Sequence, residues 1–175
     1  MTITADRTVV INSDFTLELS GEIANEILAI AISSTKKPIY VIINSNGGSV
    51  RALRTIISAL KVSTCKIVTI TTGIALSCGA ILFLQGDERI MLPDSELAFH
   101  EPRTTCSSFN HKEMIHAFKY SKRNDDFFVD EMAAKLKLSK KAIRSKIAYK
   151  TLYLNPEEAL KIGAATSIAA KISDI

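Results

Sequence analysis

The sequence predicts an α/β domain in which at least part of the sheet is parallel. Segments rich in β-branched and aromatic residues alternate with segments whose apolar residues recur at helical spacing. The strand segments are continuous apolar runs, which are typical of a sheet covered on both faces. With 47% apolar and 23% charged residues, the 175-residue chain is expected to form one domain over residues 1–175 with a substantial core.

The alternation begins near the N-terminus. Residues 7–20 are predicted to form short β segments, and a helix is predicted from Gly21 onward because apolar residues recur there at helical spacing. The run PIYVIIN (38–44) predicts a buried strand that ends in a glycine turn. The segment SVRALRTIISALK (49–61) predicts the helix that follows directly.

A second strand and helix pair follows in the middle of the chain. KIVTITTG (66–73) predicts a buried strand that stops at Gly73, and IALSCGAILFLQG (74–86) predicts a short buried helix. ERIMLP (88–93) and ELAFHE (96–101) predict two further short strands separated by a turn.

A long helix is predicted over about residues 112–138. Its ends are apolar but its middle, SKRNDD (121–126), is polar, so part of it is expected to project from the domain and meet another subunit. Two final helices are predicted, one capped by Ser139 and one capped by Asn155 that ends at Gly163.

Charge and cysteine usage limit the classes of partner. The net charge is only +4, and the basic segment 135–150 alternates with aliphatic residues at helical spacing, which favours a solvated helix face over nucleic-acid binding. Cys65, Cys78 and Cys106 lack metal-site spacing, so we expect reduced thiols and neither a metal nor a cofactor. No signal-peptide pattern opens the sequence and no apolar run approaches the roughly 18 residues that span a membrane, so a cytoplasmic protein is expected.

Three short motifs carry residues suited to catalysis. The turn NSNGGSV (44–50) leaves backbone amides unhindered, as an oxyanion site requires, although an ordinary strand-to-helix turn uses the same glycines. Ser77 lies among small residues at a strand-to-helix turn and fits either a helix cap or a nucleophile beside the amide of Cys78. His100, at a strand end, fits either a structural residue or a general base. The conjunction of the three in one small domain favours catalysis.

These motifs resemble those of ClpP, the proteolytic subunit of the Clp protease. The family pattern of INSPGGSV, then G.AASMGA, then LPNS...HQP is matched here by INSNGGSV (43–50), GIALSCGA (73–80) and LPDSELAFHEP (92–102). The likeness continues through the long helix, which resembles the family's handle, into NPEEALKIG (155–163). It covers about residues 20–168.

The resemblance implies the ClpP/crotonase-like fold, built from repeated β-β-α units, and two stacked seven-membered rings joined through the handle helices. It also implies that Ser77 is the nucleophile, His100 the general base, and the amides of Gly48 and Cys78 the oxyanion hole. Peptide and protein substrates, fed by an AAA+ unfoldase, would be held by β-augmentation beside the glycine turn and residues 103–106.

The third member of the triad departs from the family. Where the family has an aspartate, AYKTLYLNPEEA places Lys150 or Thr151. Loss of this acid reduces the rate about 10⁴-fold in known triads. Three outcomes are open: the Thr151 hydroxyl replaces the acid, another acid (Glu101, Asp94 or Asp125) replaces it, or the subunit is a poor or silent hydrolase. Lys150 acting as the base is a fourth arrangement.

The leading hypothesis is a cytoplasmic, self-compartmentalising serine endopeptidase of the ClpP type. Two other departures concern the short sequence before Arg7, where the family carries a longer leader that contacts the ATPase, and RTTCSSFN (103–110), which replaces a glycine-rich stretch. The alternative from another class is a catalytically weak or silent ClpP-like subunit with a structural or regulatory role in the ring. A crotonase-like acyl-CoA enzyme is more distant, because the Ser77 and His100 pair would have no purpose there.

Overall fold

Strands and helices alternate along the chain, as the sequence predicts. The structure is a computed structural model that describes residues 3–103 and 110–175. Its strands are β1 (Thr8–Ile11), β2 (Ile39–Ser45), β3 (Ile67–Leu76), β4 (Glu88–Met91), β5 (Glu96–Phe99), β6 (Leu152–Leu154) and β7 (Ser167–Ile168). Its α-helices are α1 (Leu17–Ser33), α2 (Val50–Val62), α3 (Cys78–Phe83), α4 (His111–Lys135), α5 (Lys140–Ile147) and α6 (Pro156–Ile162).

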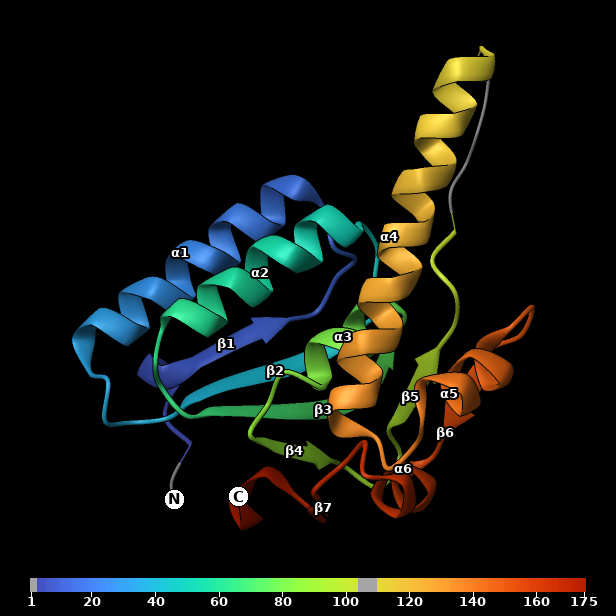
Figure 1. The fold of residues 1–175 in the computed structure, drawn as a ribbon. Coiled ribbons are helices and arrows are strands. Elements are labelled where there is room, and N and C mark those ends of the chain that lie inside the picture. The colour runs from blue at the N-terminus through green and yellow to red at the C-terminus, as the bar shows by residue number, and fades with distance from the viewer. Residues whose placement is uncertain (1–2, 104–109) are drawn as a thin grey trace.

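A seven-stranded sheet forms the centre of the described residues (Figure 1). Strands β1, β2, β3, β4 and β7 lie in that order and all pair in parallel. The last part of β3 leaves β4 and pairs in parallel with β5, which carries β6 antiparallel on its other edge. The predicted α/β class with parallel pairing is therefore confirmed.

Both faces of the sheet are covered by apolar side chains. Helices α1, α2 and α3 pack on one face (Figure 1), and residues such as Ile27, Leu53 and Phe83 are fully buried between them and the strands. On the opposite face a smaller cluster contains Tyr40, Val68, Ile70 and Ile90. The chain segments near the two ends pack against this smaller cluster, so the expected coverage of both faces is present.

Strand β3 extends three residues beyond Gly73, so the predicted strand end and helix start are wrong here. Residues Ile74–Leu76 stay in the sheet because they pair with β5. The Ile74 amide donates to Asn44 Oδ1 over 3.1 Å, and a Cβ on Gly73 would lie 2.6 Å from that same oxygen. The glycine therefore allows the Asn44 side chain to approach and does not end the strand. Helix α3 begins only at Cys78.

Helix α1 begins at Leu17, four residues before the predicted start at Gly21. Thr16 caps it, because its hydroxyl accepts a hydrogen bond from the Leu19 amide over 3.1 Å. Gly21 lies inside the helix, and a Cβ there would meet nothing within 4 Å. This glycine marks no boundary, which explains the wrong prediction.

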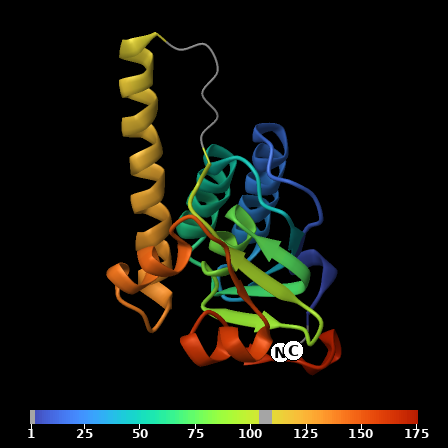
Figure 2. The same ribbon diagram turned by 90° about the vertical axis from the view of Figure 1, so that its right-hand side faces the viewer.

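The long helix α4 rises away from the rest of the molecule (Figure 1), and Figure 2 shows it standing to one side of the sheet. Asn110 and Glu113 form a reciprocal capping box at its start. In its projecting half, Met114 is 56% and Phe118 72% exposed.

The predicted caps at Ser139 and Asn155 are confirmed by hydrogen bonds from the helix amides that follow them.

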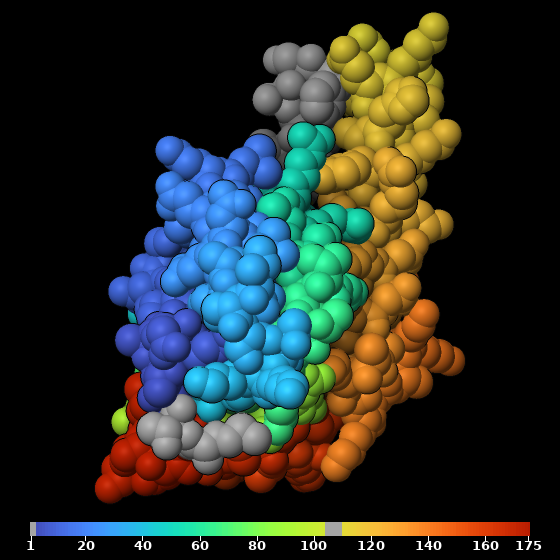
Figure 3. Space-filling model, turned by 90° about the vertical axis from the view of Figure 1, so that its left-hand side faces the viewer, coloured from blue at the N-terminus to red at the C-terminus, as the bar shows by residue number. Residues whose placement is uncertain are grey.

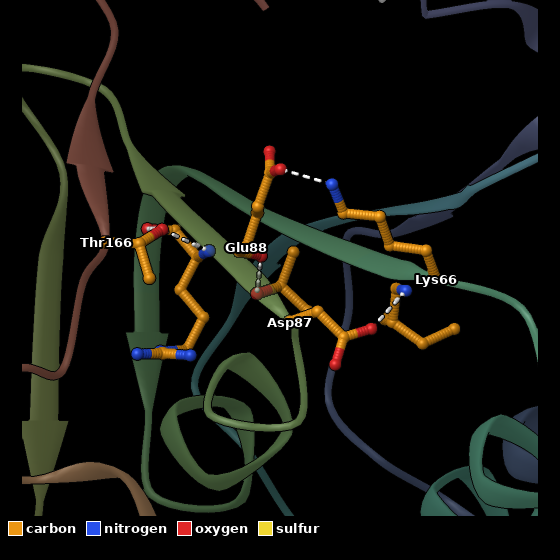
Figure 4. A network of polar contacts seen from close by, with 7 residues as sticks. Lys66, Asp87, Glu88 and Thr166 are labelled. Atoms are coloured by element: carbon orange, nitrogen blue, oxygen red, sulfur yellow. Dashed lines mark hydrogen bonds and ion pairs between the residues drawn. The ribbon is translucent and has the colours of Figure 1, made fainter.

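Polar contacts fasten β4 to its neighbours, as Figure 4 shows. Lys66 and Glu88 form an ion pair between exposed side chains. The Asp87 carboxylate accepts from the Ile67 amide over 2.8 Å, and Thr166 Oγ1 accepts from the Arg89 amide over 2.7 Å. These bonds join the end regions of β3, β4 and β7.

Arg89 is a buried charge that is held by carbonyl groups. Its side chain is only 8% exposed, and its guanidinium donates to the carbonyls of Ala164 (2.7 Å), Gly86 (3.0 Å) and Gly163 (3.1 Å). Because Gly163 ends α6, the arginine ties that helix to the loop before β4. Each carbonyl is bound by a different nitrogen of the planar guanidinium, whereas an ammonium group carries its three donors on a single nitrogen and cannot reproduce this spacing.

We expect Arg89→Lys to lower the free energy of unfolding by about 2 kcal/mol, because hydrogen bonds from a buried cation are lost while the carbonyls stay buried. Urea denaturation measures the change. The control is Arg144→Lys, whose partner Asp126 and own side chain are 49% and 47% exposed. It should change stability by at most about 1 kcal/mol. Equal losses in the two variants would contradict this role of Arg89.

Candidate active site

Ser77 lies at the junction between β3 and α3. Its φ of +54° is in the left-handed region, which few non-glycine residues adopt and which is often found at functional sites. Its side chain makes no capping hydrogen bond to α3, although the residue stands at the N-cap position. Its amide donates to the carbonyl of Ala98 on β5 over 2.8 Å. The half-buried Ser77 hydroxyl therefore does not act as the cap of α3.

The Gly47–Gly48 turn lies directly against this junction. Both glycines have positive φ, +101° and +132°. A Cβ on Gly47 would lie 2.6 Å from the Leu76 carbonyl oxygen and 2.9 Å from the Cys78 amide nitrogen. Side chains do not fit into such contacts, so glycine is required for the two backbones to meet.

Phe15 holds the glycine turn from the other side. A parallel bridge joins Phe15 to Gly48 through two hydrogen bonds, from the Phe15 amide to the Gly47 carbonyl (2.6 Å) and from the Ser49 amide to the Phe15 carbonyl (2.9 Å). The amide of Gly48 takes no part in this bridge. Ser45, which is 2% exposed, adds a hydrogen bond by accepting from the Gly47 amide over 3.0 Å.

Cys78 follows Ser77 and is fully buried. Its thiol donates to the carbonyl of Gly48, with Sγ and the oxygen 3.1 Å apart. Burial raises the pKa of this thiol to about 12, so it stays protonated and is a poor nucleophile. As the first residue of α3 its amide has no acceptor within the helix. The backbone amides of Gly48 and Cys78 therefore come from two segments that touch each other.

His100 is half-buried and follows the last residue of β5. Its Nδ1 lies 2.7 Å from the carbonyl oxygen of Glu101. Because a carbonyl only accepts, this contact places the proton on Nδ1 and leaves Nε2 of the neutral ring as the acceptor. No hydrogen bond joins His100 to Ser77 among the described residues. The two are linked through β5, whose Ala98 carbonyl binds the Ser77 amide two residues before His100.

A pocket of about 340 Å³ adjoins the imidazole. It is lined by His100, Glu101, Pro102, Arg103, Ile147, Tyr149, Lys150 and Thr151. Phe99 of β5 pairs with Leu152 of β6 in antiparallel register. Extended by one residue, this register would put His100 opposite Thr151, and residues opposite each other on antiparallel strands share a face. The geometry thus favours Thr151 over Lys150 as the neighbour of the histidine.

The three alternative acids differ in their surroundings. Glu101 lines it, and its carboxylate accepts from the Tyr149 amide over 3.4 Å. Asp125, on α4, is half-buried; burial first, and then the negative charge of Glu101, raise the pKa of its carboxyl group. Its Oδ1 has no hydrogen-bond partner among the described residues. Asp94 lies in the turn before β5, at the end of that strand opposite to His100.

Sequence reasoning missed the backbone groups and supporting residues of the site. The carbonyl of Glu101 binds the histidine, and Phe15 and Ser45 hold the glycine turn. Backbone carbonyls have no signature in a sequence, and Phe15 meets Gly48 only through the fold. Cys106 and the expected substrate edge at residues 104–106 lie outside the described residues.

Neither a group of metal ligands nor a helix able to cross a membrane occurs in the part of the chain that the structure describes. No three His, Cys, Asp or Glu side chains within it gather as metal ligands would. None of its helices combines the length and the apolar character needed to cross a membrane.

Comparison with known proteins relates the chain to one family. The chain matches the family model of the Clp protease over residues 1–171. It is 31% identical over 99 residues to proteolytic subunit 1 of the ATP-dependent Clp protease of Bacillus cereus, covering 55% of this chain and 51% of that protein. It is 38% identical over 91 residues to subunit 2 from Prochlorococcus marinus, covering 49% and 46%. The matched part spans about half the length of these curated relatives. By its match over nearly the whole sequence, the chain belongs to the Clp protease family.

Proposed function

We propose that this protein is a serine endopeptidase of the ClpP type, with residues 1–175 forming one peptidase domain. The observation that carries the proposal is the contact between the Gly47–Gly48 turn and the strained Ser77–Cys78 junction. This contact supports an oxyanion hole built from backbone amides of two segments next to a serine, as acyl transfer requires. The relatives are named as proteolytic subunits, which agrees with this chemistry.

The reaction follows the general order of serine peptidases. His100 Nε2 removes the proton of Ser77 as Oγ attacks the peptide carbonyl, and the amides of Gly48 and Cys78 bind the resulting oxyanion. The histidine then gives this proton to the leaving amine. A water molecule, deprotonated by the same nitrogen, hydrolyses the acyl-enzyme and restores the serine. The bond between Nδ1 and the Glu101 carbonyl supports this assignment, because it keeps Nε2 free to act as the base.

Neutral groups orient His100 in this proposal. The Glu101 carbonyl accepts from Nδ1, and Thr151, one of the two residues that match the family's aspartate, lines the same pocket as the histidine. Neutral acceptors stabilise the protonated ring less than a carboxylate does, so turnover is expected to be slow. A catalytically weak or silent ring subunit is the second candidate, and it is the non-acidic Thr151 that favours it.

The assembly is part of the proposal. Met114, Ile115 and Phe118 are 56%, 42% and 72% exposed on the projecting half of α4, which suits a handle that packs against a second subunit. We infer stacked seven-membered rings of this chain, a cytoplasmic location and protein substrates delivered by an AAA+ unfoldase. The relatives are described as ATP-dependent, which fits such a partner.

We expect a fluorophosphonate probe to label Ser77, and the adduct to be located by mass spectrometry of the purified protein. His100→Ala should abolish the labelling because the hydroxyl loses its base. His116→Ala, at an exposed position on α4, should leave it unchanged. An assembled ring that takes up no probe would exclude the peptidase and favour the silent subunit.

Thr151→Asp should increase kcat/KM for a peptide substrate, by up to about 10⁴-fold, because a carboxylate at this position would stabilise the protonated histidine. Peptidase assays on the purified variant measure the change. Thr151→Asn, which adds similar bulk without charge, is the matched control and should raise the rate far less. Equal rates in the two variants would mean that position 151 does not act on His100.

Gly47→Ala should slow the probe reaction about 10²-fold or more, because the added Cβ pushes the turn away from Cys78 and misplaces an oxyanion donor. The rate of labelling at Ser77 is the measurement. Gly21→Ala is the control; its Cβ meets open space within α1, so labelling stays normal while stability rises by about 0.5–1 kcal/mol. Normal labelling of a folded Gly47→Ala protein would rule out this turn as part of the site.

A further inference from the structure

Three arginines gather in one pocket between α2 and α4. Figure 3 shows the surfaces of these two helices side by side. The pocket has a volume of about 250 Å³ and is lined by Arg51, Arg54, Tyr120, Arg123 and Asn124. Neither the peptidase chemistry nor the packing of the sheet uses these arginines.

Aromatic rings hold the three guanidinium groups in place. Arg51 Nε donates to the Tyr120 hydroxyl over 3.4 Å, and its Cζ lies 5.5 Å from the centre of that ring. The Cζ of Arg123 lies 5.9 Å from the same ring centre. The Cζ of Arg54 lies 4.2 Å from the centre of the Phe127 ring. A cation over a ring is attracted to its face without using N–H groups, so the N–H groups that are not bonded to Tyr120 stay available to a ligand.

The positive charge of this pocket is not balanced. All five ion pairs among the described residues involve other side chains. Arg51 lies in the first turn of α2, which contains no acidic residue, although the positive end of a helix dipole favours one there. Arg54, one turn further on, adds a like charge. The Arg51 hydrogen bond and the nearby arginine charges lower the pKa of Tyr120, which agrees with a positive potential.

The volume of the pocket and its position in the chain indicate what kind of ligand it holds. At about 250 Å³ it is smaller than the roughly 300–1,000 Å³ of small-molecule sites, and so fits a single side chain. Arg51 follows Gly48 by three residues, so the pocket begins where the proposed peptide-binding turn ends. Carboxylates bind guanidinium groups through paired hydrogen bonds.

We propose that this arginine pocket binds an aspartate or glutamate side chain of the peptide substrate. The inference rests on the proposed function, because it assumes a peptide held beside the glycine turn. It makes the protein selective for acidic segments.

The test measures peptide binding without hydrolysis. The protein is the full chain with Ser77→Ala, and the ligand is a short peptide labelled with an uncharged fluorophore. A series of such peptides carries a single Glu at each position in turn, and a matching series carries Gln at the same positions. Fluorescence anisotropy should show about tenfold tighter binding of Glu than of Gln at one position. Added salt should reduce this preference, because screening weakens exposed charge pairs.

Variants of the arginines complete the test. The double variant Arg51→Gln with Arg123→Gln should lose the preference for Glu. The double variant Arg51→Lys with Arg123→Lys should keep only part of the preference, because lysine keeps the positive charge but lacks the paired N–H groups of the guanidinium. Arg144→Gln, an arginine already paired with Asp126, is the matched control and should keep the full preference. Circular dichroism checks that each variant is folded.

Several results would overturn the proposal. One is equal binding of Glu and Gln at every position, and another is a preference that survives in the folded double glutamine variant. Loss of ring assembly in that variant, with no preference for Glu in the parent, would assign the pocket to an acidic segment of a second copy. Failure to bind any peptide would also overturn it. Probe labelling of Ser77 decides the peptidase separately, so the two failures can be told apart.

Discussion

The close approach of Gly47 to the backbone of Leu76–Cys78 is the constraint on which the candidate site depends. It follows from an irregularity between β2 and β3, in which Ile43 pairs with Thr71 but Ser45 pairs with Ala75. An advance of two residues along β2 therefore lies opposite an advance of four residues along β3. The Ile74 amide, which loses its partner in the β ladder, donates to the Asn44 side chain instead. The bulge advances the end of β3 relative to the glycine turn, and Ser77 lies against Gly47 as a result.

Most of the polar groups around this junction belong to the backbone. Carbonyls of Ala98 and Glu101 bind the Ser77 amide and the His100 ring, and the Phe15 bridge fixes the glycine turn. Backbone groups in a sheet move little relative to one another, so donors and acceptors are aligned before a ligand arrives. A site built in this way tolerates exchange of many side chains but not of its glycines. The departure at Thr151 fits this pattern, since the histidine already has a backbone partner.

The sequence predicts well those features that depend on neighbouring residues, such as helix caps. It predicts poorly those features that depend on pairing between distant segments of the chain. The caps at Ser139 and Asn155 and the strand at residues 38–44 follow from neighbouring residues, and the structure contains them. Gly73 has the pattern of a strand end, but pairing with β5 continues the strand past it. The glycine turn and the Ser77–Cys78 segment contact each other because they follow the carboxyl ends of the neighbouring parallel strands β2 and β3. The arginine pocket has no such signal, because Arg51 and Arg123 meet only when α4 packs beside α2.

The burial of the Cys78 thiol affects how the candidate site responds to oxidising and alkylating reagents. Peroxides and alkylating reagents attack the thiolate, and this sulfur is held as a thiol, without access to solvent, on the carbonyl of Gly48. An added oxygen atom would also find no space in a residue that is fully enclosed. The cysteine beside the candidate nucleophile is therefore protected from oxidative damage, and the glycine turn it supports keeps its geometry in an oxidising medium.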